Sequence, residues 1–104
     1  MPIVEVTIVP VGTGTTSLSR YVADMQNLLE QAREPIHYQL TPMSTIIEGE
    51  LTDLLEVVRR LHESPFVQGA DRVCTTIKID DRRDRPSSME QKMKSVADRL
   101  QSST

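Results

Sequence analysis

Four segments of the chain alternate between apolar and polar residues, as strands of a half-buried sheet do. These segments are 3–9, 36–41, 44–50 and 73–80. Pro10 ends the first of them, because a proline has no N–H with which to continue a strand ladder. Pro42 marks a short connection between the second and the third, so these two should form an antiparallel hairpin.

Three other segments carry apolar residues at helical spacing. The first is predicted to begin near the candidate N-caps Thr16 and Ser17 and to end at about Arg33, before a proline. The second should be capped by Thr52 and should break at Ser64-Pro65. Its expected apolar stripe is Leu51, Leu54, Leu55, Val58 and Leu61.

The third helical segment follows Pro86. Ser87-Ser88-Met89-Glu90 has the form of a capping box, in which a serine and a glutamate three residues apart satisfy the first N–H groups of a helix. The apolar stripe of this helix is Met89, Met93, Val96 and Leu100.

The predicted order is therefore β-α-β-β-α-β followed by α, in a single domain over residues 1–104. Right-handed crossovers place the first two helices on one face of a four-stranded antiparallel sheet, which is a ferredoxin-like sandwich of the α/β (α+β) class. The other face mixes apolar and polar side chains. We expect a homo-oligomer in which copies of the chain meet either through this face or through the edges of the sheet. The residues of this face are Ile3, Glu5, Thr7, Val9, His37, Gln39, Thr41, Cys74, Thr76 and Lys78.

Charge and composition exclude some partners. A net charge of −3, from 15 acidic and 12 basic residues, and an aromatic content of 3% argue against nucleic acid. The one dense basic stretch, 81–85, contains two aspartates that largely cancel it and is interpreted as a solvated connection. No segment reaches the roughly 18 apolar residues of a membrane span. The single cysteine and the lack of a targeting signal before Ile3 lead us to expect a cytoplasmic protein.

Glu48 is the first candidate for function. It lies inside a predicted strand and is followed by Gly49, which either ends the strand or forms a bulge in a solvated face. The alternative is that a half-buried carboxylate beside a residue without a side chain marks a site where a cationic or amine-bearing ligand approaches the backbone. Thr45 could then supply a neutral hydroxyl at the same site.

Other side chains are weaker candidates. Tyr38 is a core residue or the wall of a site for an aromatic ligand, and Phe66 is expected in the core. His37 and His62 lack the spacing of a zinc site and are expected at the surface, while Cys74 is expected to be a small buried residue. No triad or P-loop pattern is present, although Gly12-Thr13-Gly14 forms a turn before a helix.

Four short motifs together give a family resemblance. They are Pro10-Val11-Gly12-Thr13-Gly14, Pro42-Met43-Ser44-Thr45 with Ile47-Glu48-Gly49, Gly69-Ala70-Asp71-Arg72-Val73, and Lys78-Ile79-Asp80-Asp81-Arg82-Arg83-Asp84. In this order the chain resembles the small thiamine-binding protein family, which is related to YkoF-type proteins. The resemblance implies a ferredoxin-like fold, a homodimer or homotetramer, and binding of thiamine or its hydroxymethylpyrimidine moiety without catalysis and without a further cofactor. Carried onto this chain, it points to Thr45 and Glu48, followed by Ser44 and Tyr38, as ligand-binding residues.

Two other functions remain open at this stage. Ferredoxin-like oligomers also include enzymes that act on small metabolites, and fold does not determine function. An oligomeric interaction scaffold without a ligand is the second alternative.

Overall fold

The computed structural model describes residues 1–14, 18–84 and 88–102 of the chain. The elements follow the predicted order, β-α-β-β-α-β and then α. Their bounds are β1 Ile3–Val11, α1 Ser19–Gln31, β2 His37–Leu40, β3 Thr45–Glu48, α2 Leu51–Val67, β4 Arg72–Asp80 and α3 Met89–Ser102. The candidate caps Thr16, Ser17 and Ser87 lie outside the described residues.

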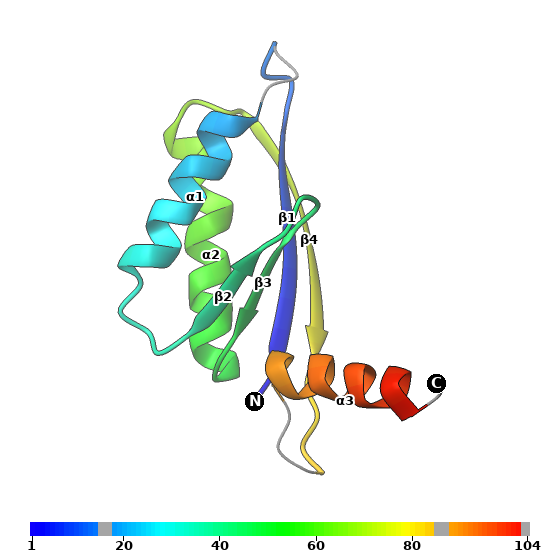
Figure 1. Ribbon diagram of the computed structural model, residues 1–104. Coiled ribbons are helices and arrows are strands. Elements are labelled where there is room, and N and C mark those ends of the chain that lie inside the picture. The colour runs from blue at the N-terminus through cyan, green and yellow to red at the C-terminus, as the bar shows by residue number, and fades with distance from the viewer. Residues whose placement is uncertain (15–17, 85–87, 103–104) are drawn as a thin grey trace.

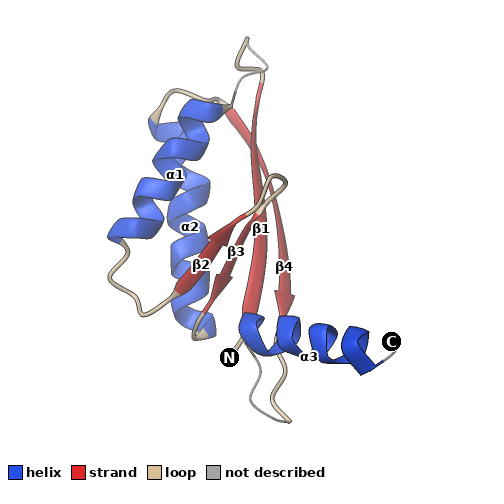
Figure 2. Cartoon of the chain, viewed as in Figure 1, coloured by secondary structure: helices blue, strands red, loops and turns tan. Residues whose placement is uncertain are grey.

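The four strands form one antiparallel sheet in the order β2-β3-β1-β4, with α1 and α2 on the same face (Figures 1 and 2). This is the predicted ferredoxin-like arrangement. The core lies between the sheet and these two helices and consists of Val4, Val6, Met25, Leu29, Ile47, Leu54, Val57, Val58 and Leu61. None of the described helices is long and apolar enough to cross a membrane.

Strand register decides which side chains face the helices. Val4 is paired with Ile47 and Val6 with Thr45, and both valines are buried beneath the helices. Intervening positions such as Glu5, which is paired with Ile46 and Lys78, therefore point to the opposite face, which we call the open face. The register confirms the predicted open-face positions within β1, β2 and β4, while Thr41 lies beyond the end of β2 in the hairpin turn.

Helix α2 differs from the sequence prediction, because it continues through Pro65 and ends at Val67. A proline within a helix removes one N–H donor and crowds the carbonyl of the residue four positions earlier, so it often ends the helix within the following turn. Here the N–H groups of Gly69 and Ala70 donate to the carbonyls of Phe66 and Pro65, both at 3.0 Å, in a Schellman motif. Gly69 has φ of +100°, a conformation that residues with side chains rarely adopt.

The start and the apolar stripe of α2 also differ from the prediction. The helix begins at Leu51 with Glu50 as its N-cap residue, so Thr52 lies within the first turn. Leu55 is 44% exposed, and Val57 occupies the core in its place.

Three single-residue expectations were wrong. Cys74 is exposed, because it lies on the open face opposite Val9. Phe66 is 38% exposed, since it packs edge-on against the His62 ring rather than into the core. His62 is half-buried and not a free surface residue, because its Nδ1 lies 2.6 Å from Thr75 Oγ1.

Helix α3 lies across the open face, at the end of the sheet where β1 begins and β4 ends (Figure 1). Ser88 Oγ accepts a hydrogen bond from the N–H of Gln91 at 3.1 Å, so a serine caps this helix. The predicted stripe is present but largely uncovered: Met93, Val96 and Leu100 are 70%, 55% and 64% exposed.

Candidate functional site

The four residues predicted to bind a ligand divide between the two faces of the sheet. Thr45 and Tyr38 face the helices, since they are paired with the buried residues Val6 and Ile47. Glu48 and Ser44 are separated from Thr45 by an odd number of residues and therefore lie on the open face. The structure thus brings Glu48 and Ser44 to one surface and does not bring Thr45 or Tyr38 to it.

Glu48 is buried, with 8% of its surface exposed, because α3 covers it. Its Oε2 accepts a hydrogen bond of 2.6 Å from the backbone N–H of Met89, the first residue of α3. A carboxylate at this position satisfies an N–H that has no partner within the helix and interacts favourably with the positive end of the helix dipole. Glu48 therefore holds the N-terminus of α3 against the sheet.

Ser44 lies beside the connection between β2 and β3. Its hydroxyl is 3.1 Å from Glu5 Oε2 and donates to that carboxylate on the neighbouring strand. Thr41 organises the connection: its hydroxyl donates to the Ser44 carbonyl and accepts from the Ser44 N–H, both at 2.9 Å. The local hydrogen bonds of one turn thus aim Ser44 at Glu5.

Two adjoining cavities lie between α3 and the open face, and we call them together the α3 cleft. The first, of about 250 Å³, is lined by Ile3, Glu5, Gln39, Ile46, Lys78, Asp80, Met89, Lys92 and Met93. The second, of about 400 Å³, is lined by His37, Gln39, Glu48, Ser88, Met89, Glu90 and Met93. Gln39 and the two methionines line both, so the cavities lie side by side.

The α3 cleft has an apolar floor and more carboxylates than ammonium groups in its walls. Ile3 and Ile46 supply apolar surface from the sheet, and Met89 and Met93 cover it from the helix. Four carboxylates and two ammonium groups line the two cavities. Lys92 forms an ion pair with Asp80, which ties α3 to the end of β4.

A third cavity lies on the helix side, beside the β2–β3 hairpin, and we call it the hairpin cleft. Its volume is about 210 Å³, and its walls are mainly apolar side chains such as Val22, Met25 and Leu40. Thr45 lines it, and among the described residues the Thr45 hydroxyl makes no side-chain hydrogen bond. Ser44 also lines the hairpin cleft, and neither Ser44 nor Thr45 lines the α3 cleft.

Tyr38 and Gly49 both pack against other parts of the same chain. The Tyr38 ring packs against the core cluster. A Cβ at Gly49 would lie 3.1 Å from Ile36 Cγ2 and 3.3 Å from the Pro35 carbonyl oxygen. The side of Gly49 that lacks a side chain is therefore filled by this chain's own atoms, which accounts for a glycine after the strand without any ligand.

The charged loop after β4 is internally paired, as its composition predicts. Arg83 and Arg82 form ion pairs with Asp81 and Asp84 respectively. The hydrogen bond from Arg83 lowers the pKa of the Asp81 carboxyl below its usual value. Arg85 lies outside the described residues. Within residues 1–14, 18–84 and 88–102, no three His, Cys, Asp or Glu side chains gather as metal ligands.

Sequence reasoning missed Gln39, Met89, Met93 and Lys92 as lining residues of the α3 cleft. Gln39 was predicted only as an open-face residue, and the other three belong to a helix whose position relative to the sheet has no local sequence signal. The strong apolar stripe of that helix indicated that it packs on something, but not on which face.

The chain is similar in sequence to one protein family and to several known proteins. The profile of the family described as "Thiamine-binding protein" matches residues 4–97. The UPF0045 protein YqgV of Bacillus subtilis is 55% identical over 103 residues, which cover 97% of this chain and 99% of YqgV. A UPF0045 protein of Methanothermobacter thermautotrophicus is 41% identical over 97 residues, covering 92% of this chain and 96% of that protein.

Solved structures share the fold. Protein MJ1052 of Methanocaldococcus jannaschii superimposes with a TM-score of 0.80 at 30% identity, over 92% of this chain and 95% of that one. A candidate thiamine biosynthesis/salvage protein of Thermotoga maritima gives a TM-score of 0.72 at 20% identity, over 91% and 97% of the two chains, and supports the fold alone. The profile match over most of the chain, together with these relatives, shows that the protein belongs to the thiamine-binding protein family.

Proposed function

We propose that this protein binds thiamine, or its hydroxymethylpyrimidine moiety, in the α3 cleft and acts as a carrier or sensor that does not transform the ligand. The observation that carries the proposal is a cleft with an apolar floor, an excess of carboxylates and a central amide, in a member of the thiamine-binding protein family.

The chemistry of the cleft suits both rings of thiamine. The thiazolium ring carries a permanent positive charge, which the acidic lining favours. The aminopyrimidine ring needs hydrogen-bond donors and acceptors, and the Gln39 amide supplies both. Gln39 lies where the two cavities meet, so it can contact either ring, while Met89 and Met93 offer polarisable sulfur to a flat ring.

The two main carboxylates differ in how far their charge is already compensated. Glu48 accepts the Met89 N–H and interacts with the α3 dipole. Glu5 is exposed and accepts a neutral hydroxyl from Ser44. Glu5 is therefore the carboxylate with more unsatisfied charge to offer a cation, and we assign it the main electrostatic contact, with Glu48 positioning the helix over the ligand.

The hydrogen-bond partners in the cleft support binding rather than catalysis. Glu48 is engaged as a helix cap, Ser88 accepts the Gln91 N–H, and Asp80 is paired with Lys92. A group that acts as acid, base or nucleophile has to reach the substrate, and these groups are directed at α3 instead.

The test is titration of the purified protein with thiamine by isothermal calorimetry. Glu5→Gln and Gln39→Leu should each weaken binding at least about tenfold, since a hydrogen bond to a charged group contributes about 1.5–3 kcal/mol. Thr45→Val is the matched control, because it changes the hairpin cleft only. Mass spectrometry of the ligand after prolonged incubation should show thiamine unchanged.

Three results would contradict the proposal. No heat or thermal stabilisation with thiamine or hydroxymethylpyrimidine would rule out the function. Loss of binding in Thr45→Val with retention in the other two variants would move the site to the hairpin cleft. Turnover of the ligand would replace the carrier or sensor with an enzyme.

A further inference from the structure

The charges in the α3 cleft decide which chemical forms of a ligand it accepts. Thiamine and hydroxymethylpyrimidine each carry a hydroxyl group that is either free or esterified with phosphate. A phosphate monoester adds a charge of about −1.5 to −2 at pH 7. Four carboxylates and two ammonium groups line the cleft, so acceptance of a phosphate depends on whether a positive group is free to pair with it.

Lys92 is already paired within the chain. Its ammonium group forms an ion pair with the carboxylate of Asp80, the last residue of β4. A phosphate that contacted Lys92 would lie next to Asp80 as well, and two anions at close range repel each other. Lys92 therefore offers little net attraction to a phosphate.

Lys78 lies opposite a carboxylate on the neighbouring strand. In the β1–β4 pair it faces Glu5, and both side chains are exposed on the open face. The Cβ atoms of facing residues are roughly 4.5–5.5 Å apart, so opposite charges on their side chains attract each other. A phosphate at Lys78 would approach Glu5 at a similar range, and the positive charge of Lys78 is thus balanced locally.

The N-terminus of α3 is the other feature of the cleft that would attract an anion, because the first N–H groups of a helix have no partner within it. Here Glu48 Oε2 accepts the Met89 N–H at 2.6 Å, and Ser88 Oγ accepts the Gln91 N–H at 3.1 Å. His37 faces Glu48 across the β2–β3 pair, so this base also lies beside the carboxylate. A carboxylate of the protein thus occupies the place that a phosphate would take.

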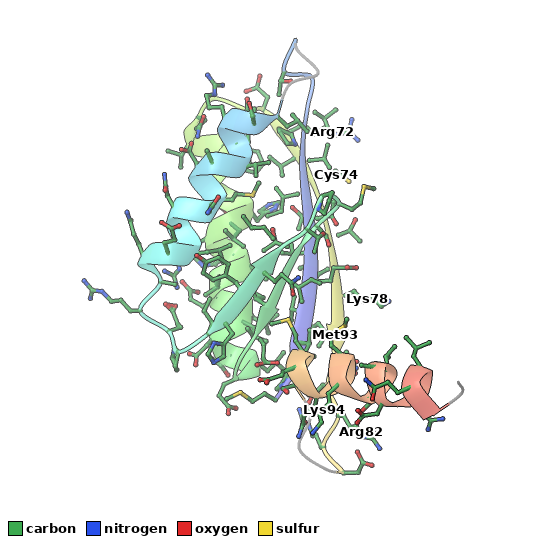
Figure 3. The ribbon with its side chains drawn as sticks, in the orientation of Figure 1. Arg72, Cys74, Lys78, Arg82, Met93 and Lys94 are labelled. Carbon is green, nitrogen blue, oxygen red and sulfur yellow. The ribbon has the colours of Figure 1, made fainter. Side chains whose placement is uncertain are left out.

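The other cations near α3 lie outside the cleft. Figure 3 shows Met93 on the side of α3 that faces the strands, whereas Lys94 and Arg82 lie beyond its opposite side. Lys94 follows Lys92 by two residues, which places it about 200° further around the helix. Glu90 adds an exposed carboxylate to the second cavity. Among the described residues that line the cleft, negative charge is therefore in excess and each ammonium group has a carboxylate beside it.

We propose that the α3 cleft excludes phosphate, so that the protein binds thiamine or hydroxymethylpyrimidine as the free alcohol and rejects thiamine monophosphate and thiamine diphosphate. Glu48 and Glu5 determine this specificity: Glu48 closes the helix N-terminus to anions, and Glu5 balances Lys78. The inference rests on the proposed function, because it concerns the same cleft. A protein with this specificity carries or senses the ligand in its unphosphorylated state and does not respond to the products of phosphoryl transfer.

The first experiment compares two ligands on the wild type by isothermal calorimetry at about 50 mM and about 500 mM salt. Thiamine monophosphate should bind at least about tenfold more weakly than thiamine at low salt, because the phosphate meets the surplus carboxylates. The ratio of the two dissociation constants should fall at high salt, since screening weakens repulsion between exposed charges. Pyrophosphate alone should not raise Tm.

The second experiment removes single charges from the cleft. Glu5→Gln leaves Lys78 without its facing carboxylate, so thiamine should bind more weakly and thiamine monophosphate more tightly, by at least about threefold. Damage to the cleft would weaken both ligands, so changes of opposite sign identify an electrostatic cause. Glu48→Gln keeps an oxygen that accepts the Met89 N–H but removes the charge, and it should lower the ratio of the dissociation constants at least about threefold.

Glu63→Gln is the matched control. It makes the same charge change on an exposed residue of α2, away from the cleft, and should leave the ratio within about twofold of the wild type. Amide hydrogen exchange of α3 should be the same in Glu48→Gln and in the wild type, which separates the effect of charge from loosening of the helix.

The outcomes separate this inference from the proposed function. Equal affinities of the wild type for thiamine and thiamine monophosphate would overturn the inference and leave the proposed function intact. A Glu5→Gln variant in which both ligands weaken by the same factor would do the same. No binding of thiamine or hydroxymethylpyrimidine would overturn both.

Discussion

At the scale of single residues, Glu48 shows what a sequence can and cannot indicate. Its place inside a strand and next to a glycine left two interpretations open, a carboxylate on a solvated face or one drawn away from bulk water, and the structure buries it. Its hydrogen bond to the Met89 N–H could not be predicted, because the two residues are 41 positions apart and no local pattern connects them. The alternation of side chains along a strand, by contrast, already places Thr45 and Glu48 on opposite faces of the sheet. The prediction that both bind one ligand did not take this into account.

Replacement of Glu48 by alanine should loosen α3. The Met89 N–H loses its acceptor and the helix its N-terminal charge, which together contribute about 1–2 kcal/mol. Amide hydrogen exchange of residues 90–95 should become faster by about tenfold, while that of β1 changes little. Glu63→Ala removes a carboxylate that is exposed on α2 and serves as the control. Unchanged protection of α3 would show that its position does not depend on Glu48.

At the scale of elements, the hydrophobic pattern predicts the type and order of all seven, because each strand and helix carries its own period. The ends were harder to predict. Pro65 was expected to stop α2, but it lies in the last turn, and the Schellman hydrogen bonds at Gly69 and Ala70 satisfy the carbonyls of Phe66 and Pro65. The glycine was a better indicator of the helix end than the proline.

Substitution of Gly69 by alanine tests this explanation. No atom lies within 4 Å of an added Cβ, so the cost comes only from φ of +100°. Unfolding free energy from urea denaturation should fall by about 1 kcal/mol or more. Ala70→Gly adds flexibility next to the same motif without requiring a positive φ and should cost less. A Gly69→Ala variant as stable as the wild type would mean that the turn relaxes to another conformation.

At the scale of the whole molecule, the sequence predicts a sheet with one covered face and one mixed face, and the structure confirms both. The sequence could not show that α3 covers only part of the mixed face, since the direction of a terminal helix depends on contacts between distant residues such as Lys92 and Asp80. It could not show that β4 is left as a long bare edge either. Strand order follows from topology, and no single segment encodes it.

Thermal stability should depend on protein concentration if the chain forms the homo-oligomer that its sequence predicts. A dimer that dissociates on unfolding gains stability by mass action, so Tm should rise by roughly 3 °C for each tenfold increase in concentration. Differential scanning fluorimetry over a hundredfold range of protein concentration would measure this. A flat dependence for the wild type would argue for a stable single chain.

The alternation of side chains along β3 restricts how this hairpin can change in evolution. Adding or deleting one residue between the Thr41 turn and Glu48 would rotate every later side chain of the strand to the opposite surface, placing a carboxylate among Val4, Leu54 and their neighbours and Ile47 in water. Changes of two residues would preserve the pattern. Homologues should therefore vary in hairpin length by even steps, and an odd step should coincide with a compensating bulge.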